Sequence, residues 1–75
     1  MRTCFLGIKN LGCERFADEI RNKLWNTEGV ISVWVYTPEK EVKCIYDSRF
    51  ITTEKIEEIL KDMGFHIDYI KDGQS

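Results

Sequence analysis

Hydrophobic and polar residues alternate along four short segments of the chain, and two longer segments repeat hydrophobic residues with helical spacing. The alternating segments are rich in β-branched and aromatic residues, which fit a pleated strand. The predicted strands span residues 3–8, 30–36, 41–46 and 65–70. Residues 37–40 contain the only proline, at position 38, and predict a turn that joins the second and third strands into a hairpin.

The two helical segments each carry one hydrophobic stripe with charged residues between its members. The stripe of the first helix consists of Cys13, Phe16, Ala17, Ile20 and Leu24. Gly29 follows as a stop signal. The second helix begins at Thr52 or Thr53, either of which can cap free backbone donors, and Gly64 ends it. Its stripe consists of Ile56, Ile59, Leu60 and Met63.

The predicted order of elements is βαββαβ, the split-βαβ arrangement. This is an α+β, ferredoxin-like two-layer sandwich, in which two helices cover one face of a four-stranded antiparallel sheet. The first and third strands are expected at the centre, with the second beside the third. Cys4 and Cys44 then point inward as core residues, because alternate residues of a strand face opposite sides. We expect a single domain over residues 1–71 and a tail over residues 72–75.

Composition narrows the class of protein further. A chain of 75 residues supports one small domain, and its hydrophobic fraction of 43% is too high for a disordered chain. No apolar run approaches the roughly 20 residues that a membrane span needs. The three cysteines cannot all pair within one chain, and no secretory segment is present, so we expect a reducing, cytoplasmic location.

Residues 8–17, with the sequence IKNLGCERFA, resemble the metal loop of the heavy-metal-associated domain. That family includes small copper chaperones and the N-terminal modules of heavy-metal P-type ATPases. Its pattern is apolar-x-Gly-Met/Leu-x-Cys-x-x-Cys, followed by a helix and Gly-Val. Leu11 matches the buried Met/Leu and Cys13 matches the first cysteine, whereas Phe16 stands in place of the second cysteine and Asn10 in place of the glycine.

This alignment continues without insertion through Gly29-Val30 to Gly64-Phe65, and so covers nearly the whole chain. A competing alignment places Cys13 on the second cysteine and Asn10 on the lost first ligand. That version needs an extra helical turn before Gly29, so we prefer the gapless one. Both versions leave one cysteine at the site.

The resemblance implies a site in which two thiolates, three residues apart, bind a soft ion such as Cu(I), or Zn(II) with further ligands. Cys13 is then the only candidate metal ligand, Leu11 anchors the loop, and Phe16 and Phe65 shape the site by meeting over it. We expect no tight binding of Cu(I) or Zn(II) by a single copy, and an ion shared between Cys13 and another molecule's thiolates instead. Equally, Cys13 could be a partly buried, inert residue.

The function that the resemblance implies is metal trafficking or regulation, by docking on a heavy-metal ATPase, on a chaperone-type partner or on a second copy. An enzyme is not expected, because the chain has neither a phosphate loop nor a Cys/His pair at a recognisable spacing. A lone histidine, His66, is expected to be a solvated strand residue.

The outer face of the predicted sheet suggests a second possible function. Phe5, Trp34, Tyr36 and Ile45 are predicted to point away from the helices, with Phe5, Ile45 and Trp34 side by side. Such a patch favours a protein-interaction or dimerisation domain that has lost metal binding. Nucleic-acid binding is a third possible function. An isoelectric point of about 5.3 and a third strand with few aromatic rings weigh against it.

Overall fold

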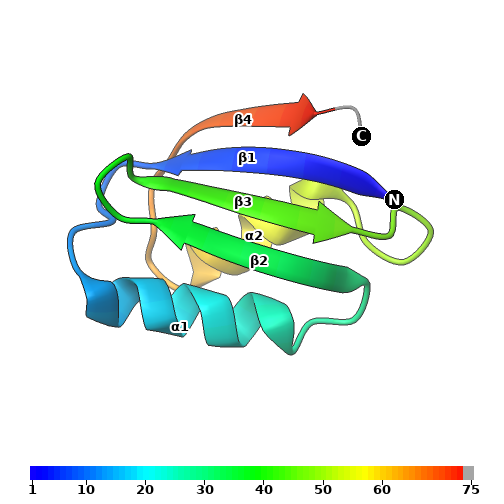
Figure 1. The fold of residues 1–75 in the computed structure, drawn as a ribbon, viewed down its shortest axis with the longest axis horizontal. Helices are drawn as coiled ribbons and strands as arrows, with labels where there is room; N and C mark the ends of the chain where they lie inside the picture. Colours follow the sequence, from blue (N-terminus) through cyan, green and yellow to red (C-terminus); the bar gives the residue numbers. More distant parts are fainter. Residues whose placement is uncertain (74–75) are drawn as a thin grey trace.

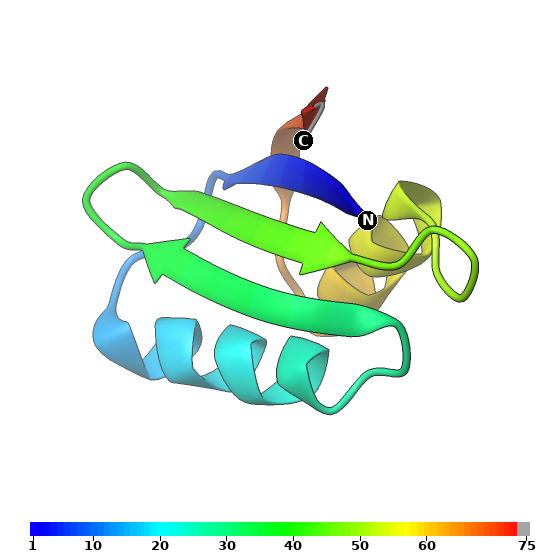
Figure 2. The same cartoon turned by 45° about the vertical axis from the view of Figure 1, so that its right-hand side comes forward.

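The computed structural model describes residues 1–73, which form one antiparallel sheet and two helices. Its elements are β1 (Arg2–Ile8), α1 (Glu14–Trp25), β2 (Val30–Tyr36), β3 (Glu41–Tyr46), α2 (Thr53–Asp62) and β4 (Ile67–Gly73). The strand order is β2-β3-β1-β4, and both helices lie on the same face of the sheet (Figures 1 and 2). The prediction of a ferredoxin-like βαββαβ fold is therefore confirmed. Neither helix within residues 1–73 has the length and apolar character needed to span a bilayer.

The core lies between the sheet and the helices. Inward side chains of the two central strands, among them Leu6 and Val42, pack against Ile20 and Leu24 of α1 and Leu60 of α2 within one hydrophobic cluster. The remaining buried members of this cluster are Cys4, Ile8, Leu11, Val33, Cys44, Tyr46, Ile51, Ile56 and Phe65. The predicted alternation is confirmed, because Cys4, Leu6 and Ile8 of β1 are buried and so is every second residue of β3.

Local chemistry sets the ends of α2. Thr52 is its N-cap, and the Thr52 hydroxyl oxygen accepts a hydrogen bond from the Lys55 amide at 3.2 Å. The helix ends before Gly64, whose φ of +96° is a left-handed conformation that favours glycine. The Phe65 amide then donates to the Leu60 carbonyl at 3.1 Å, which turns the chain back towards the sheet.

The last strand differs from the prediction. It begins at Ile67 rather than at residue 65, because Phe65 is buried in the core and the His66 backbone is hydrogen-bonded to the β1–α1 connection. It also continues through Gly73, since Asp72 and Gly73 pair with Cys4 and Thr3 of β1. Residues 72 and 73, predicted to lie in a tail, are thus part of the sheet, and residues 74 and 75 lie outside the described part of the chain.

Asp72 helps to hold this extension of β4 in place. Its carboxylate accepts hydrogen bonds from the Arg2 guanidinium at 3.1 Å and from the Tyr46 hydroxyl at 3.3 Å. Both donors lie at the ends of the central strands. The sequence prediction missed this extension because residues 71–73 contain no hydrophobic residue, and only the tertiary pairing supplies their partners.

The outer face carries Phe5, Trp34, Tyr36 and Ile45 as predicted, but in a different order. Lys43 pairs with both Phe5 and Trp34, so a lysine rather than Ile45 lies between the two aromatic residues. Ile45 lies in the next row. The strand register decides this arrangement. Hydrophobic alternation does not determine the register fully, because a shift of two residues keeps every side chain on the same face.

We predict that Gly7→Ala destabilises the fold, because a Cβ at this position would overlap the Tyr69 ring that lies across it. The ring would have to move, and the hydrogen bond that the Tyr69 hydroxyl donates to Glu41 at 2.6 Å would be disturbed. Chemical denaturation should show a loss of about 1–3 kcal/mol in the free energy of unfolding.

The matched control is Gly12→Ala, where no atom lies within 4 Å of the added Cβ. Its free energy of unfolding should stay within about 0.5 kcal/mol of the unmodified chain. Equal stability of the two variants would contradict the packing of Tyr69 on Gly7.

Candidate metal centre

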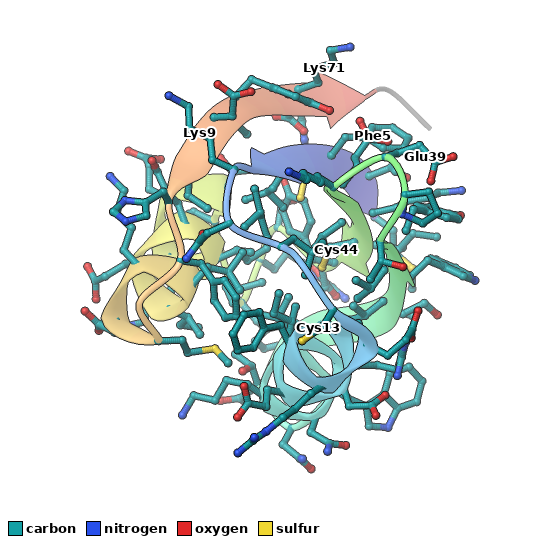
Figure 3. The ribbon with its side chains drawn as sticks, turned by 90° about the vertical axis from the view of Figure 1, so that its left-hand side faces the viewer. Phe5, Lys9, Cys13, Glu39, Cys44 and Lys71 are labelled. Carbon is teal, nitrogen blue, oxygen red and sulfur yellow. The ribbon has the colours of Figure 1, made fainter. Side chains whose placement is uncertain are left out.

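Three connections meet at one end of the molecule, the left end in Figure 1. They are the β1–α1 connection (residues 9–13), the β2–β3 turn (residues 37–40) and the α2–β4 connection (residues 63–66). The chain termini of the described structure lie towards the opposite end. Cys13 lies at this meeting point, at the start of α1 (Figure 3).

Cys13 is the N-cap residue of α1 and is exposed as a free thiol. Its backbone carbonyl accepts hydrogen bonds from the amides of Phe16 at 3.2 Å and Ala17 at 3.3 Å, whereas its side chain makes no capping hydrogen bond. The first turn of a helix favours negative charge, because its backbone donors and dipole point towards the N-terminus. The thiol is therefore available to an ion or a partner from solution.

Leu11 anchors the loop that presents Cys13. It is buried in the core cluster, and its amide donates to the Ile8 carbonyl at 3.4 Å. The two residues between Leu11 and the helix are exposed. The loop is thus held from inside by one leucine, while the thiol remains at the surface.

Phe16 and Phe65 are in contact beside Cys13. Their ring centroids lie 5.6 Å apart with an interplanar angle of 82°, an edge-to-face pair. Phe65 is 6% exposed and Phe16 is 37% exposed. The predicted contact is present, but the prediction that Cys13 and Phe16 belong to the buried stripe of α1 is wrong, because both residues are exposed. Ala17, Ile20 and Leu24 face the sheet, and Phe16 lies one position outside that stripe.

Asn10 joins two of the three connections, a role that the sequence analysis did not assign. Its side-chain amide donates to the Gly64 carbonyl at 3.1 Å, and its side-chain oxygen accepts from the His66 amide at 2.9 Å. The Lys9 amide adds a third bond, to the His66 carbonyl at 2.9 Å. We call this set of three hydrogen bonds the Asn10 clamp. The only indication of this role in the sequence was the residue type, because an asparagine side chain carries both a hydrogen-bond donor and an acceptor.

The third connection is held by Glu14 in the first turn of α1. Its carboxylate accepts a hydrogen bond from the Thr37 hydroxyl at 3.0 Å. The Ile8 amide donates to the Lys40 carbonyl at 2.8 Å in the same region. Cys13 therefore lies in a loop that is tied on one side to the α2–β4 connection and on the other to the hairpin turn.

Cys4 and Cys44 lie away from this site. They are directly opposite each other on β1 and β3 and are fully buried, as predicted for core residues. A hydrogen bond to Cys44, together with burial, raises the pKa of the Cys4 thiol. The Cys44 thiol donates to the Ile45 carbonyl at 3.9 Å. These two sulfurs are therefore enclosed in the sheet and are not available to join Cys13.

The side chains of metal-binding types do not form a larger cluster in the described residues. Within residues 1–73, no three or more side chains of the metal-binding types His, Cys, Asp and Glu cluster in a way that could hold an ion. His66 is exposed and contributes backbone contacts to the Asn10 clamp. A phenylalanine ring cannot replace a thiolate. Cys13 is the one exposed thiol among the described residues.

Curated proteins with a similar sequence include copper-transporting ATPases. No family model matches the chain. Copper-transporting ATPase 2 of Mus musculus is 28% identical over 69 residues, which is 92% of this chain and 5% of that protein. Copper-transporting ATPase 2 of Rattus norvegicus matches with the same identity and coverage. The chain thus spans about 5% of the length of the curated relatives that it matches.

Solved structures agree closely with the fold. The yeast copper transporter domain Ccc2a is 25% identical, with a TM-score of 0.88 and coverage of 97% of this chain and 100% of that chain. A copper-binding domain from HMA7, a P-type ATPase, is 22% identical, with a TM-score of 0.85 and coverage of 97% and 95%. The Atx1-Cu(I)-Ccc2a complex contains a chain that is 24% identical, with a TM-score of 0.82 and full coverage of both chains.

We predict that Asn10→Ala loosens the two connections without unfolding the domain, because both side-chain bonds of the Asn10 clamp lie at the surface. The free energy of unfolding should fall by about 1 kcal/mol. Amide hydrogen exchange of His66, followed by NMR, should become faster.

Asn26→Ala serves as the control, because that side chain bonds only to the Asn22 carbonyl of its own helix, at 2.8 Å. It should leave the exchange of His66 unchanged. Unaltered His66 exchange in Asn10→Ala would mean that Asn10 does not hold the two connections together.

Proposed function

Because the chain is homologous to the metal-binding domains of copper-transporting ATPases, and its structural neighbours are heavy-metal-associated domains, we propose that it serves metal trafficking or its regulation by docking on a partner. In this proposal the chain is a binding module and not an enzyme. Its site is degenerate: Cys13 is its only metal-binding residue, and it takes part in transfer or sensing only together with another molecule.

One observation carries this proposal. The exposed thiol of Cys13 opens α1, and the residue one turn later is Phe16, whose ring packs on Phe65. An apolar contact therefore occupies the position at which the family pattern has its second cysteine. The contact between these rings stabilises the end of the domain that a bound ion would otherwise hold together.

Cu(I) is the cargo that suits such a site best. Thiolate ligands select soft ions, and Cu(I) is satisfied by fewer ligands than the four that Zn(II) normally takes. Two sulfurs from two molecules can share one Cu(I), whereas a Zn(II) site would need further donors that this end of the chain does not offer. A complex of the Atx1-Cu(I)-Ccc2a type supports the idea that domains of this fold meet around the ion.

The proposed partner is a heavy-metal ATPase or a chaperone-type protein, or a second copy of this chain. Each would bring a thiolate to the exposed side of Cys13. We place this encounter in the cytoplasm, because a free surface thiol and two adjacent reduced thiols in the core suit a reducing compartment.

The direct test is titration with Cu(I) in the presence of a competing chelator. We predict weak uptake, with one ion for two chains and the appearance of a dimer in sedimentation. Cys13→Ser should abolish both. Cys44→Ala removes a buried thiol instead and should leave uptake unchanged, provided that circular dichroism confirms its fold. One ion bound per single chain, or uptake that survives Cys13→Ser, would overturn the proposal.

A second test restores the missing ligand. Phe16→Cys should bind one Cu(I) per chain, at least about a hundredfold more tightly than the unmodified chain, because the second thiolate is held in the same molecule. Phe50→Cys is the control, since Phe50 is exposed on the β3–α2 connection and would add a remote thiol. A gain in Asn10→Cys but not in Phe16→Cys would favour the competing alignment, in which Cys13 is the second cysteine.

A further inference from the structure

The face of the sheet opposite the helices is uncovered within the described chain (Figure 2) and carries four aromatic side chains. Phe5 comes from β1, Trp34 and Tyr36 from β2, and Tyr69 from β4. Trp34, the largest of them, is 40% exposed. Figure 3 places Phe5 on the side of β1 that faces away from both helices. Aromatic side chains from three strands therefore share one open sheet face.

Lysines alternate with the aromatic residues across this face. The strand register aligns Trp34 of β2, Lys43 of β3, Phe5 of β1 and Lys71 of β4 in a single row, which we call the Trp34–Lys71 row. Neighbouring strands lie about 4.8 Å apart, so the backbone positions of Phe5 and Trp34 are roughly 10 Å apart, with Lys43 on the strand between them. The row therefore repeats ring, cation, ring, cation.

Contacts within the face hold these groups in place. The Lys43 ammonium lies 4.9 Å from the centroid of the Trp34 ring, and the Lys71 ammonium lies 5.2 Å from that of the Tyr69 ring. The Tyr69 hydroxyl donates to the Glu41 carboxylate, and its ring occupies the space above Gly7. The Tyr69 ring thus lies over the backbone of β1, and the two ammonium groups lie over the Trp34 and Tyr69 rings.

The outer strand positions carry a smaller share of negative charge than the chain as a whole. The formal net charge of the chain is −2, whereas the outer strand positions described above carry two lysines against the single carboxylate of Glu41, which is already hydrogen-bonded. Acidic residues gather instead on α2, at Glu54, Glu57, Glu58 and Asp62. An anionic ligand would therefore be directed to the sheet face and away from the helices.

We propose that the outer sheet face binds single-stranded nucleic acid. Nucleobases stack on the Phe5 and Trp34 rings, and the phosphates between them pair with Lys43 and Lys71. The bases and the phosphates together match the Trp34–Lys71 row, because every base has a π-face for the rings and every phosphate linkage carries one negative charge for the lysines. Recognition of this kind is tolerant of sequence, since no base edge is contacted.

A second copy of the chain fits this face less well. A symmetric pairing of two such faces would bring the Lys43 and Lys71 ammonium groups of both copies together, and like charges across an interface oppose association. The inference does not rest on the metal site, because Cys13 is not on this face. Cys13→Ser should therefore leave nucleic-acid binding unchanged.

Tryptophan fluorescence tests the proposal directly. In Trp25→Phe, emission comes only from Trp34, since the chain has two tryptophans. Titration at low salt with an oligouridine of about ten nucleotides, and with the matching oligothymidine, should quench this emission in a saturable way. Two phosphate contacts predict a slope of about −1.4 in a plot of log K against log salt concentration.

Matched variants distinguish binding at the outer sheet face from binding elsewhere on the surface. Phe5→Leu should weaken binding about tenfold, and the pair Lys43→Gln and Lys71→Gln should remove most of the salt dependence. Lys23→Gln with Lys55→Gln makes the same change in net charge on the helices and should have little effect. Absence of quenching, equal losses in both lysine pairs, or burial of Trp34 by dimerisation without any oligonucleotide would each overturn the proposal.

Discussion

The one-sided covering of the sheet by its two helices is the constraint on which the other features of this protein depend. Strand residues alternate between the two faces, so each side chain of β1 and β3 is either in the core or on the open surface. This constraint encloses Cys4 and Cys44 as a pair in the sheet and directs Phe5 and Lys43 outward. Of the three thiols, it leaves Cys13 alone accessible, because Cys13 belongs to a connection and not to a strand.

The end of the molecule around Cys13 shows how such a domain can keep its shape around one thiol. The Asn10 clamp ties the β1–α1 connection to the α2–β4 connection, and the Phe16–Phe65 contact fills the space beside the thiol. Hydrogen bonds and apolar contact act there within one chain. The geometry of the loop is therefore set by contacts within the protein itself.

The two proposed binding surfaces lie on different parts of the molecule. Cys13 is at the end where three connections meet, whereas the Trp34–Lys71 row crosses the sheet face, as the labelled Cys13, Phe5 and Lys71 show in Figure 3. They also differ in chemistry, since one offers a soft sulfur and the other offers rings and ammonium groups. A ligand on the open face leaves the thiol free, so the two activities can be measured independently.

The hydrophobic pattern was sufficient for the order of elements and for the inward position of Cys4 and Cys44, because burial of one face per strand and one stripe per helix is a local property. The strand order was predicted from the split-βαβ arrangement, of which this order of elements is typical. Only the tertiary structure decided what depends on partners distant in the chain. Residues 71–73 are part of the strand because β1 supplies their hydrogen bonds, and Phe16 contacts Phe65 while lying outside the buried stripe of α1. Asn10 bonds across more than fifty positions, and the register put Lys43 between Phe5 and Trp34. Periodicity carries no information about such pairings, since they form only when separate elements are packed together.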